Sequence, residues 1–375
     1  MIQRDIKENI KKDLFKKKII LLFGARQVGK TTLVKEIAEE MELDYHWFTG
    51  DEVDTRLLLG NATSTQLKAL YGTKKLIIID EAQRIENIGL TLKISIDFLP
   101  DVQIIATGSS AFELANKIKE PLTGRKYEYH LFPFSYHELC AYHGELDEKR
   151  LLENRLIYGS YPDVIIASGE EKRTLLEITD SYLYKDLFAY EHIKKTSLFQ
   201  KLLSALALQI GNEVSYNELA SLVGANKETV EKYIDLLEQT FVIFKLHAYS
   251  RNVRNELKKS KKIYFFDNGV RNAILNNFLP LGSRNDVGAL WKNYLISERI
   301  KLLHYNLINK NYYFWRTTQQ QEIDYLEDAN GMIDAYEFKW SENKKYKFPK
   351  TFLSHYNINE TKVIHKSNYD TFLST

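Results

Sequence analysis

The chain has 375 residues, which at roughly 100–200 residues per domain suggests two or three domains with sizeable hydrophobic cores. Hydrophobic residues make up 44% of the sequence and charged residues 27%, a balance that excludes a disordered or collagen-like chain. The net charge of +2 excludes a uniformly basic nucleic-acid coat protein, and the single cysteine, Cys140, excludes an internal disulfide framework and a multi-cysteine zinc site.

The N-terminal segment, residues 1–18, carries charged side chains throughout and lacks the apolar middle of a signal peptide. We expect it to form a basic amphipathic helix. No apolar run in the sequence approaches the roughly 18–20 residues that cross a bilayer, so no membrane segment is expected. A chain with one cysteine fits a reducing compartment, and the predicted location is the cytoplasm.

Short apolar runs alternate with helical patterns in the first third of the chain. The runs cover residues 18–23, 76–79 and 102–106, and an amphipathic helical pattern covers 31–41. Near-continuous β-branched runs are typical of strands that are buried on both faces, as in a parallel sheet. We therefore predict an α/β layer structure that closes near residues 131–135.

A phosphate-binding pattern follows the first of these strands. It matches G-x-x-x-x-G-K-[ST] through Gly24, Ala25, Arg26, Gln27, Val28, Gly29, Lys30 and Thr31, with Thr32 next in the helix. Glycines let backbone N–H groups surround phosphate oxygens, and the helix N-terminus favours the same charge. We expect Lys30 to reach the β- and γ-phosphates of ATP and Thr31 to ligate Mg²⁺. The alternative is a plain glycine turn between strand and helix.

Two acidic residues, Asp80 and Glu81, end the second predicted strand, where α/β sheets bind ligands. Asp80 is predicted to hold Mg²⁺, and Glu81 to orient or deprotonate the attacking water. Thr107 and Ser109 end the next strand at the same edge and are candidate sensors of the γ-phosphate. A solvated strand end and an ordinary turn are the structural alternatives.

Arg125 is a candidate arginine finger that acts on the nucleotide in cis or in trans. A surface arginine without a catalytic role is the alternative. Action in trans would require a neighbouring copy, so a homo-oligomer is one expectation.

These motifs resemble those of prokaryotic AAA-type ATPases that carry a C-terminal domain of unknown function, the 4143 family. The resembling segments are Leu22–Leu33, Ile79–Gln83, Thr107–Ser110, Leu122–Arg125, Tyr158–Pro162 and Lys262–Gly269, and in the fifth of them Ser160 replaces a glycine of the family pattern. The resemblance covers most of the chain. It implies an AAA-like P-loop fold with ATP and Mg²⁺ as ligands.

The second region, about residues 136–245, is predicted to be mainly helical, with a long stretch over Arg173–Tyr190 that contains neither Gly nor Pro. Within it, Ser215 and Glu218 fit a capping box at the start of a short helix, and a turn at Gly224 leads into a second helix. This is a helix-turn-helix, for which the apolar run Phe241–Leu246 would supply the wing.

The charges around the helix-turn-helix give conflicting indications about DNA. The second helix carries Lys227 and Lys232 but also four acidic residues, which opposes the attraction of phosphates. An interdomain or partner-docking role is therefore the preferred interpretation. The segment Arg251–Lys262 holds six basic residues and one acidic residue and is predicted either to follow a nucleic-acid backbone or to form a solvated loop.

The C-terminal region contains the pattern Asp-x12-Glu-x-Lys, formed by Asp324, Glu337 and Lys339 on predicted strands, with Glu298 on the preceding helix. This pattern resembles that of PD-(D/E)xK nucleases, and the C-terminal domain of the resembling ATPases is similar to that fold. The resemblance implies a second Mg²⁺ site in which the carboxylates are ligands, Lys339 assists a hydroxide, and Glu298 is either a further ligand or a group that supports a ligand without touching the metal. Acidic and lysine residues in exposed hairpins are the alternative.

The predicted fold class is α/β: a P-loop parallel sheet, then a helical and winged-helix region, then an α/β restriction-endonuclease-like domain. The predicted regions are 1–135 for the ATPase domain, 136–197 for a helical lid or linker, 198–283 for the winged helix and 284–375 for the nuclease-like domain.

The predicted function is ATP hydrolysis at Lys30, Glu81 and Arg125 that rearranges the C-terminal half, with nucleic acid or a protein as partner. One alternative is an ATP-gated, Mg²⁺-dependent nuclease. The other is a nucleotide switch that binds a partner through an inactive nuclease fold. GTP remains an alternative to ATP, although the sequence has no evident guanine-recognition segment.

Overall fold

We describe a computed structural model of the chain, which defines residues 2–109, 122–180, 196–250 and 261–374. It contains two compact units: Met1–Pro133 with Gln239–Phe241, and Phe134–Glu238 with Val242–Thr375. Most of the basic segment Arg251–Lys262, the second half of the helical stretch Arg173–Tyr190, and Ser110 lie outside the described residues.

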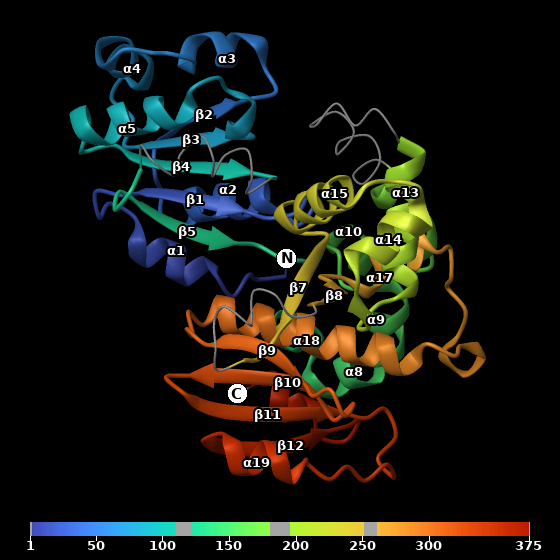
Figure 1. Cartoon of the computed structure of the whole chain (residues 1–375). Coiled ribbons are helices and arrows are strands. Elements are labelled where there is room, and N and C mark those ends of the chain that lie inside the picture. The colour runs from blue at the N-terminus through green and yellow to red at the C-terminus, as the bar shows by residue number, and fades with distance from the viewer. Residues whose placement is uncertain (1, 110–121, 181–195, 251–260, 375) are drawn as a thin grey trace. The chain divides into compact units, whose positions relative to one another are not determined.

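The first unit contains a five-stranded parallel sheet, as the apolar runs predict. Its strands are β1 (Ile19–Phe23), β2 (Tyr45–Thr49), β3 (Leu76–Asp80), β4 (Gln103–Gly108) and β5 (Lys126–His130), in the order β2-β3-β4-β1-β5 (Figure 1). Every residue of β1 and β4 is buried, which explains their continuous apolar sequences. The carboxyl ends of β1, β3 and β4 therefore meet at one edge of the sheet.

Helices of the first unit precede the first strand or connect the strands. They are α1 (Lys7–Asp13), α2 (Lys30–Glu40), α3 (Val53–Leu59), α4 (Ser64–Tyr71) and α5 (Ile88–Phe98), with a 3₁₀ turn at Ala82–Arg84. The helix α2 begins directly after the phosphate-binding pattern and buries Leu33, Val34 and Ile37. This periodic apolar face fixes α2 on the sheet and so aims its N-terminus at the carboxyl ends of the strands.

The second unit begins with short helices and continues with longer ones. They are α7 (Tyr136–His143), α8 (Glu145–Arg150), α9 (Leu152–Tyr158), α10 (Pro162–Ile166), α11 (Glu171–Ile178), α13 (Thr196–Leu208), α14 (Tyr216–Val223), α15 (Lys227–Gln239), α17 (Asn268–Ile274), α18 (Val287–Tyr305), α19 (Lys350–His355) and α20 (Tyr369–Ser374). The long helix α18 is buried on nearly all sides, and it carries Lys292, Glu298 and Lys301, which belong to sites described below.

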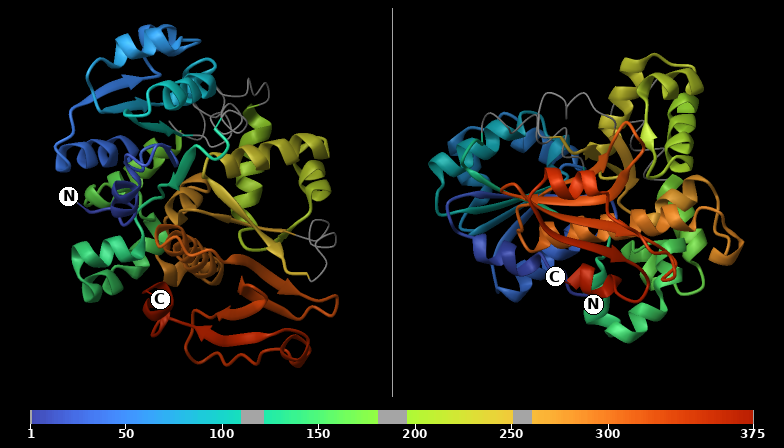
Figure 2. Two further views of the ribbon diagram at one scale, coloured as in Figure 1. Left: turned by 90° about the vertical axis from the view of Figure 1, so that its left-hand side faces the viewer. Right: turned by 60° about the horizontal axis from the view of Figure 1, so that its bottom comes forward.

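One seven-stranded sheet runs through the second unit. Its strands are β6 (Glu213–Val214), β7 (Ile243–Ala248), β8 (Lys261–Phe265), β9 (Asn311–Arg316), β10 (Glu322–Ala329), β11 (Met332–Phe338) and β12 (Ile358–Ile364), in the order β12-β11-β10-β9-β7-β8-β6. Strands β9 to β12 lie side by side in both views of Figure 2. Because β7 pairs with β9, the sheet continues across the predicted boundary between residues 283 and 284.

The predicted helix-turn-helix corresponds to α14 and α15, which are separated by Gly224, Ala225 and Asn226. Ser215 caps α14 by accepting a hydrogen bond from the Glu218 backbone N–H. The predicted wing strand is β7, which pairs antiparallel with β8. Lys245 on β7 forms ion pairs with Asp235 and Glu238 of α15, so part of the negative charge of α15 is neutralised within the unit.

Within the described ranges, no helix is both long enough and apolar enough to cross a lipid bilayer.

Candidate functional site

The phosphate-binding pattern forms a tight loop between β1 and α2. Gly29 has φ 94° and Gln27 has φ 59°, so the loop turns through left-handed backbone conformations on its way into the helix. A Cβ at Gly24 would lie 2.1 Å from the backbone oxygen of Leu131, so only glycine fits there. Within the pattern, the side chains of Ala25 and Val28 are buried, whereas Thr32, the next residue, is exposed. The glycines of the pattern therefore have steric reasons to be present.

Arg4 supports this loop from the N-terminal segment. Its buried guanidinium donates hydrogen bonds to the backbone oxygens of Val28, at 3.0 Å, and Phe132, at 2.5 Å. Nearby, Lys7 of α1 pairs with Glu36 of α2 at 2.8 Å. The sequence predicts a basic helix here but gives no signal that Arg4 contacts the phosphate loop, because the partners are backbone atoms distant in the sequence.

Lys30 is buried inside the loop. Its Nζ donates to the backbone oxygens of Gly24, at 2.9 Å, and Ala25, at 2.8 Å. Burial lowers the pKa of Lys30 to about 8, although the negative charges of Glu81 and Asp80 act in the opposite direction. The ammonium group is thus held where a nucleotide phosphate would need a positive charge, and a phosphate can replace its two backbone partners.

Asp80 joins the loop to the ends of two strands. The Thr31 hydroxyl donates to Asp80 Oδ2 at 2.9 Å, and the Thr107 hydroxyl donates to Asp80 Oδ1. The structure therefore brings together three residues that the sequence assigns to Mg²⁺ binding and phosphate sensing. A hydroxyl and a carboxylate at the mouth of a phosphate loop are hard oxygen donors, which fit Mg²⁺.

Glu81 is held beside this group by Gln83 and Ser109. Gln83 Nε2 donates to Glu81 Oε2 at 2.6 Å and to Ser109 Oγ at 3.1 Å, and the Ser109 hydroxyl lies 3.2 Å from Glu81 Oε2. Glu81 has φ 48°, a backbone conformation that is costly for a residue with a side chain and is frequent at functional sites. Gln83 was not among the predicted site residues, although it lies within the resembling segment Ile79–Gln83.

Arg125 lies away from this group. It precedes β5, and its backbone oxygen accepts from the N–H of Ile19, the first residue of β1. Because β1 and β5 are parallel, Arg125 is at the amino ends of the strands, opposite to the phosphate loop. Its guanidinium pairs with Asp97 at 3.0 Å. The structure therefore does not bring Arg125 to the nucleotide site of its own chain, and only a role in trans remains as a prediction.

The C-terminal residues Asp324, Glu337 and Lys339 do come together on neighbouring strands. Glu337 Oε2 accepts from the Asp324 backbone N–H at 3.3 Å, and Lys339 Nζ pairs with Glu337 Oε1 at 2.6 Å. Asp324 Oδ2 accepts from the Phe338 backbone N–H at 3.0 Å. The antiparallel pairing of β10 with β11 produces this arrangement, because it sets the two carboxylates on one stretch of the sheet.

Lys292 on α18 belongs to the same group and was not predicted. Its Nζ forms an ion pair with Asp324 Oδ1. Burial and the nearby charge of Asp324 raise the pKa of Glu337 to about 7, against the effect of Lys339 and Lys292. In the part of the chain that the structure defines, no three His, Cys, Asp or Glu side chains gather as a metal centre. A metal ion at Asp324 and Glu337 would therefore have these two carboxylates as its only ligands of this kind from the described residues.

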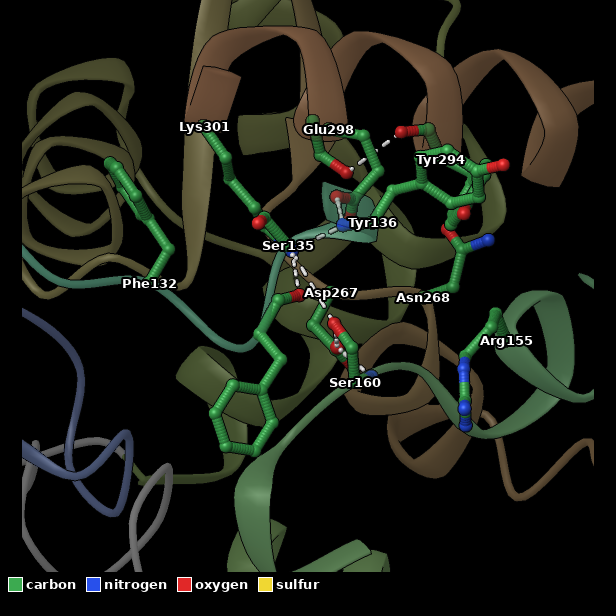
Figure 3. Close-up of polar contacts among 12 residues, drawn as sticks. Phe132, Ser135, Tyr136, Arg155, Ser160, Asp267, Asn268, Tyr294, Glu298 and Lys301 are labelled. Carbon is green, nitrogen blue, oxygen red and sulfur yellow. Dashed lines mark hydrogen bonds and ion pairs between the residues drawn. The ribbon is translucent and has the colours of Figure 1, made fainter. Parts of the chain in front are cut away.

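Glu298, the fourth residue predicted for this site, lies in a different buried cluster. Its Oε2 accepts from the Tyr136 backbone N–H at 2.6 Å, and its Oε1 pairs with Lys301 at 2.7 Å. Figure 3 shows both α18 side chains, Glu298 and Lys301, directed toward the segments of Tyr136 and Ser160. The expectation that Glu298 would be a ligand beside Asp324 and Glu337 is not met, because both of its oxygens are used in this cluster.

Ser160 and Asp267, two residues of the resembling segments, lie in the same cluster. Asp267 Oδ2 accepts from the Ser160 backbone N–H at 2.7 Å, and Asp267 Oδ1 caps α17 by accepting from the Val270 N–H at 3.0 Å. A Cβ at Gly159 would lie 2.0 Å from the Asp267 carboxylate, so the glycine is sterically required. These residues hold three segments of the unit together, which is a structural role.

Three family descriptions match parts of the chain. Residues 16–140 match the AAA domain, residues 149–280 match the domain of unknown function DUF8612, and residues 287–374 match the domain of unknown function DUF4143. The first match coincides with the parallel sheet and its phosphate loop. The first unit therefore has the fold of an AAA-type P-loop ATPase, and a DUF4143 domain follows at the C-terminus.

The chain is also similar to uncharacterized proteins. It is 27% identical over 345 residues to one from Mycobacterium tuberculosis, a match that covers 90% of this chain and 74% of the relative. A protein from Methanocaldococcus jannaschii is 28% identical over 298 residues, covering 69% of this chain and 63% of the relative.

Among solved structures, the Holliday junction branch migration motor RuvB of Thermotoga maritima aligns with a TM-score of 0.34 and 18% identity, over 68% of this chain and 95% of that one. The Pif1 helicase of Candida albicans aligns with a TM-score of 0.28 and 14% identity, over 48% of each chain. The assignment of the fold rests on the sheet order and the phosphate loop.

Proposed function

We propose that the first unit binds ATP together with Mg²⁺ and hydrolyses it. The observation that carries this proposal is the hydrogen-bonded group at the carboxyl ends of β1, β3 and β4, in which Thr31, Asp80 and Thr107 meet and Glu81 lies alongside. A plain glycine turn or a solvated strand end would not bring these side chains together.

Each residue of the site has its own role in the proposed reaction. Lys30 and the N-terminus of α2 bind the phosphates, which places the γ-phosphorus beside the ends of the strands. Glu81, held by Gln83 and Ser109, orients a water and accepts its proton as the water oxygen attacks the γ-phosphorus and the bond to ADP breaks. Thr31 and Asp80 would hold the Mg²⁺, whose chemistry when bound is to neutralise charge on the phosphates.

A substitution of Lys30 tests this proposal. In Lys30→Ala the loop loses its buried cation, so we expect phosphate release from Mg²⁺-ATP to fall at least about a hundredfold. Lys35→Ala is the matched control, because Lys35 is an exposed lysine on the same helix and should leave turnover unchanged. Undiminished hydrolysis by purified Lys30→Ala would refute the proposal.

A second candidate function belongs to the other unit. The contacts among Asp324, Glu337 and Lys339 support a Mg²⁺-dependent phosphodiesterase site in which a water attacks phosphorus and an ester oxygen leaves. Nucleic acid would be the substrate, with ATP as a gate. Loss of Mg²⁺-dependent cutting of single- and double-stranded DNA and RNA in Asp324→Asn would support it. Absence of cutting by the unaltered protein, with ATP present, would favour a partner-binding switch instead.

The helix order and strand pairing from α13 to β8 support a winged helix in this unit. With Lys245 neutralising part of α15, we propose that this element docks a protein or nucleic acid, rather than reading DNA sequence through α15 alone.

A further inference from the structure

Asp324 and Glu337 each face a lysine that belongs to their own unit. Lys292 reaches Asp324 from α18, and Lys339 reaches Glu337 from the end of β11. Asp324 is 1% exposed in its side chain, whereas Lys292 is 28% exposed. The carboxylate is therefore fixed in the interior, and its cation sits at the end of a flexible stem that reaches the surface.

Lys292 also lines a cavity of about 390 Å³ next to this pair. The cavity is bounded by β6, β8, α18, β9 and β10, and its lining includes Gly211, Lys262, Arg316 and Glu322. Lys262 pairs with Glu322 at 2.5 Å, and Arg316 pairs with Glu213 at 2.7 Å. Lys292 is thus the group that connects the interior carboxylate Asp324 with open space.

A buried hydroxyl without a partner lies at the same place. Tyr264 on β8 is fully buried, and within the described chain its hydroxyl has no hydrogen-bond partner. A Cβ on the cavity residue Gly211 would lie 3.5 Å from this hydroxyl, and the charges that act on the Tyr264 ring are those of Asp324, Glu322 and Glu337. An unused polar atom beside the cavity residue Gly211, on a ring that feels the charges of these carboxylates, indicates a place for a ligand or its bound water.

We propose that Asp324 and Glu337 form a divalent-cation site and that Lys292 is its built-in competitor, which closes the site by occupying Asp324 and leaves toward the cavity when the metal ion binds. This inference rests on the second candidate function and adds its regulation. Two carboxylates on adjacent strands offer the oxygen ligands that Mg²⁺ and Mn²⁺ prefer. The ammonium group of Lys292 already pairs with the carboxylate of Asp324, which the metal ion would also need. Binding of the metal ion and pairing with Lys292 therefore exclude each other.

The burial of Asp324 means that a departing Lys292 must be replaced by another cation. Removing the partner of a buried carboxylate leaves an uncompensated charge, which is strongly destabilising until another cation replaces it. Lys292→Ala should therefore bind Mn²⁺ more tightly than the unaltered protein and should be stabilised more by it. Lys292→Gln, which keeps a hydrogen-bond donor without the charge, should behave in the same direction if the competition is electrostatic.

The test is a titration of the full chain with Mn²⁺ alone. Electron paramagnetic resonance measures the binding, and thermal melting measures the stabilisation. We expect Lys292→Ala and Lys292→Gln to bind one Mn²⁺ at least about tenfold more tightly than the unaltered protein, with a larger rise in melting temperature. The added Asp324→Asn should abolish the gain. Lys362→Ala, which removes the partner of Glu360 on β12, should change nothing.

Two results would overturn the inference, and they differ in what else they exclude. Equal Mn²⁺ affinity with and without Lys292, but binding that Asp324→Asn abolishes, would show a metal site without a gate. No Mn²⁺ binding that depends on Asp324 in any variant would remove both the gate and the proposed phosphodiesterase site.

Discussion

At the scale of single residues, the nucleotide site depends on contacts that are local in space and scattered in sequence. The phosphate-loop pattern and the acidic strand end identify Lys30, Thr31, Asp80 and Glu81, because fixed spacings encode their chemistry. The sequence gives no sign that Arg4 supports the loop, because its hydrogen bonds go to backbone oxygens of residues 24 and 128 positions away. Such contacts appear only once the chain has folded.

Gln83 gives a residue-scale prediction. Its amide fixes the orientation of Glu81, so Gln83→Ala should lower kcat about tenfold or more while leaving the KM for ATP nearly unchanged. Steady-state kinetics of the purified variant would check this. Gln66→Ala, which affects only the cap of α4, is the control. A rise in KM with normal kcat would instead place Gln83 in nucleotide binding.

At the scale of elements, the sequence predicts buried strands better than edge strands. The runs of β1, β3 and β4 are apolar because both faces of each strand are covered. The edge strands β2 and β5 have mixed, half-exposed sequences and were not predicted, since an exposed edge leaves little hydrophobic pattern. The strands β10 and β11 were predicted as the carriers of Asp324 and Glu337, but the joining of this part of the sheet to β7 through β9 was not.

The element α18 begins with an ion-pair cluster that should make stability depend on pH. Asp286 accepts hydrogen bonds from the buried guanidiniums of Arg284, at 2.8 Å, and Arg271, at 2.5 Å. Burial alone would raise the pKa of Asp286, but these hydrogen bonds lower it to about 2. Because the pKa of Asp286 is lower in the folded state, its ion pairs stabilise the protein at pH values above the unfolded pKa of 3.8. This stabilisation is lost as the pH falls toward 2.

We therefore expect the free energy of unfolding to fall by about 1 kcal/mol more between pH 5 and 3 in the unaltered protein than in Asp286→Asn. The variant should already be less stable at pH 7, because two buried guanidiniums lose their carboxylate. Urea unfolding followed by tryptophan fluorescence suits this test, since Trp291, Trp315 and Trp340 lie in the second unit. Equal pH dependence in both proteins would show that Asp286 is not the source of the acid destabilisation. Asp147→Asn is the control, because Asp147 is an exposed aspartate.

At the scale of the whole molecule, the chemistry is divided between two units. The proposed nucleotide site lies in the first unit, while Asp324 and Glu337, the cavity beside Lys292 and the predicted helix-turn-helix lie in the second. The chain passes between the units at Pro133–Phe134, Glu238–Gln239 and Phe241–Val242. The sequence predicts the nucleotide half in detail, whereas for the second half it misplaces Glu298 and omits Lys292, because helix and sheet residues meet there through packing that no spacing encodes.

The most direct test of the central claim, ATP hydrolysis with Glu81 as the base, is the fate of bound nucleotide in Glu81→Gln. This change keeps the size of the side chain and removes the proton acceptor. After incubation with Mg²⁺ and ATP labelled on the α-phosphate, the unaltered protein and the exposed-site control Glu86→Gln should yield ADP. Glu81→Gln should bind ATP with nearly unchanged affinity, release phosphate at least about a hundredfold more slowly, and retain intact ATP. Recovery of ADP from Glu81→Gln at the rate of the unaltered protein would contradict the account.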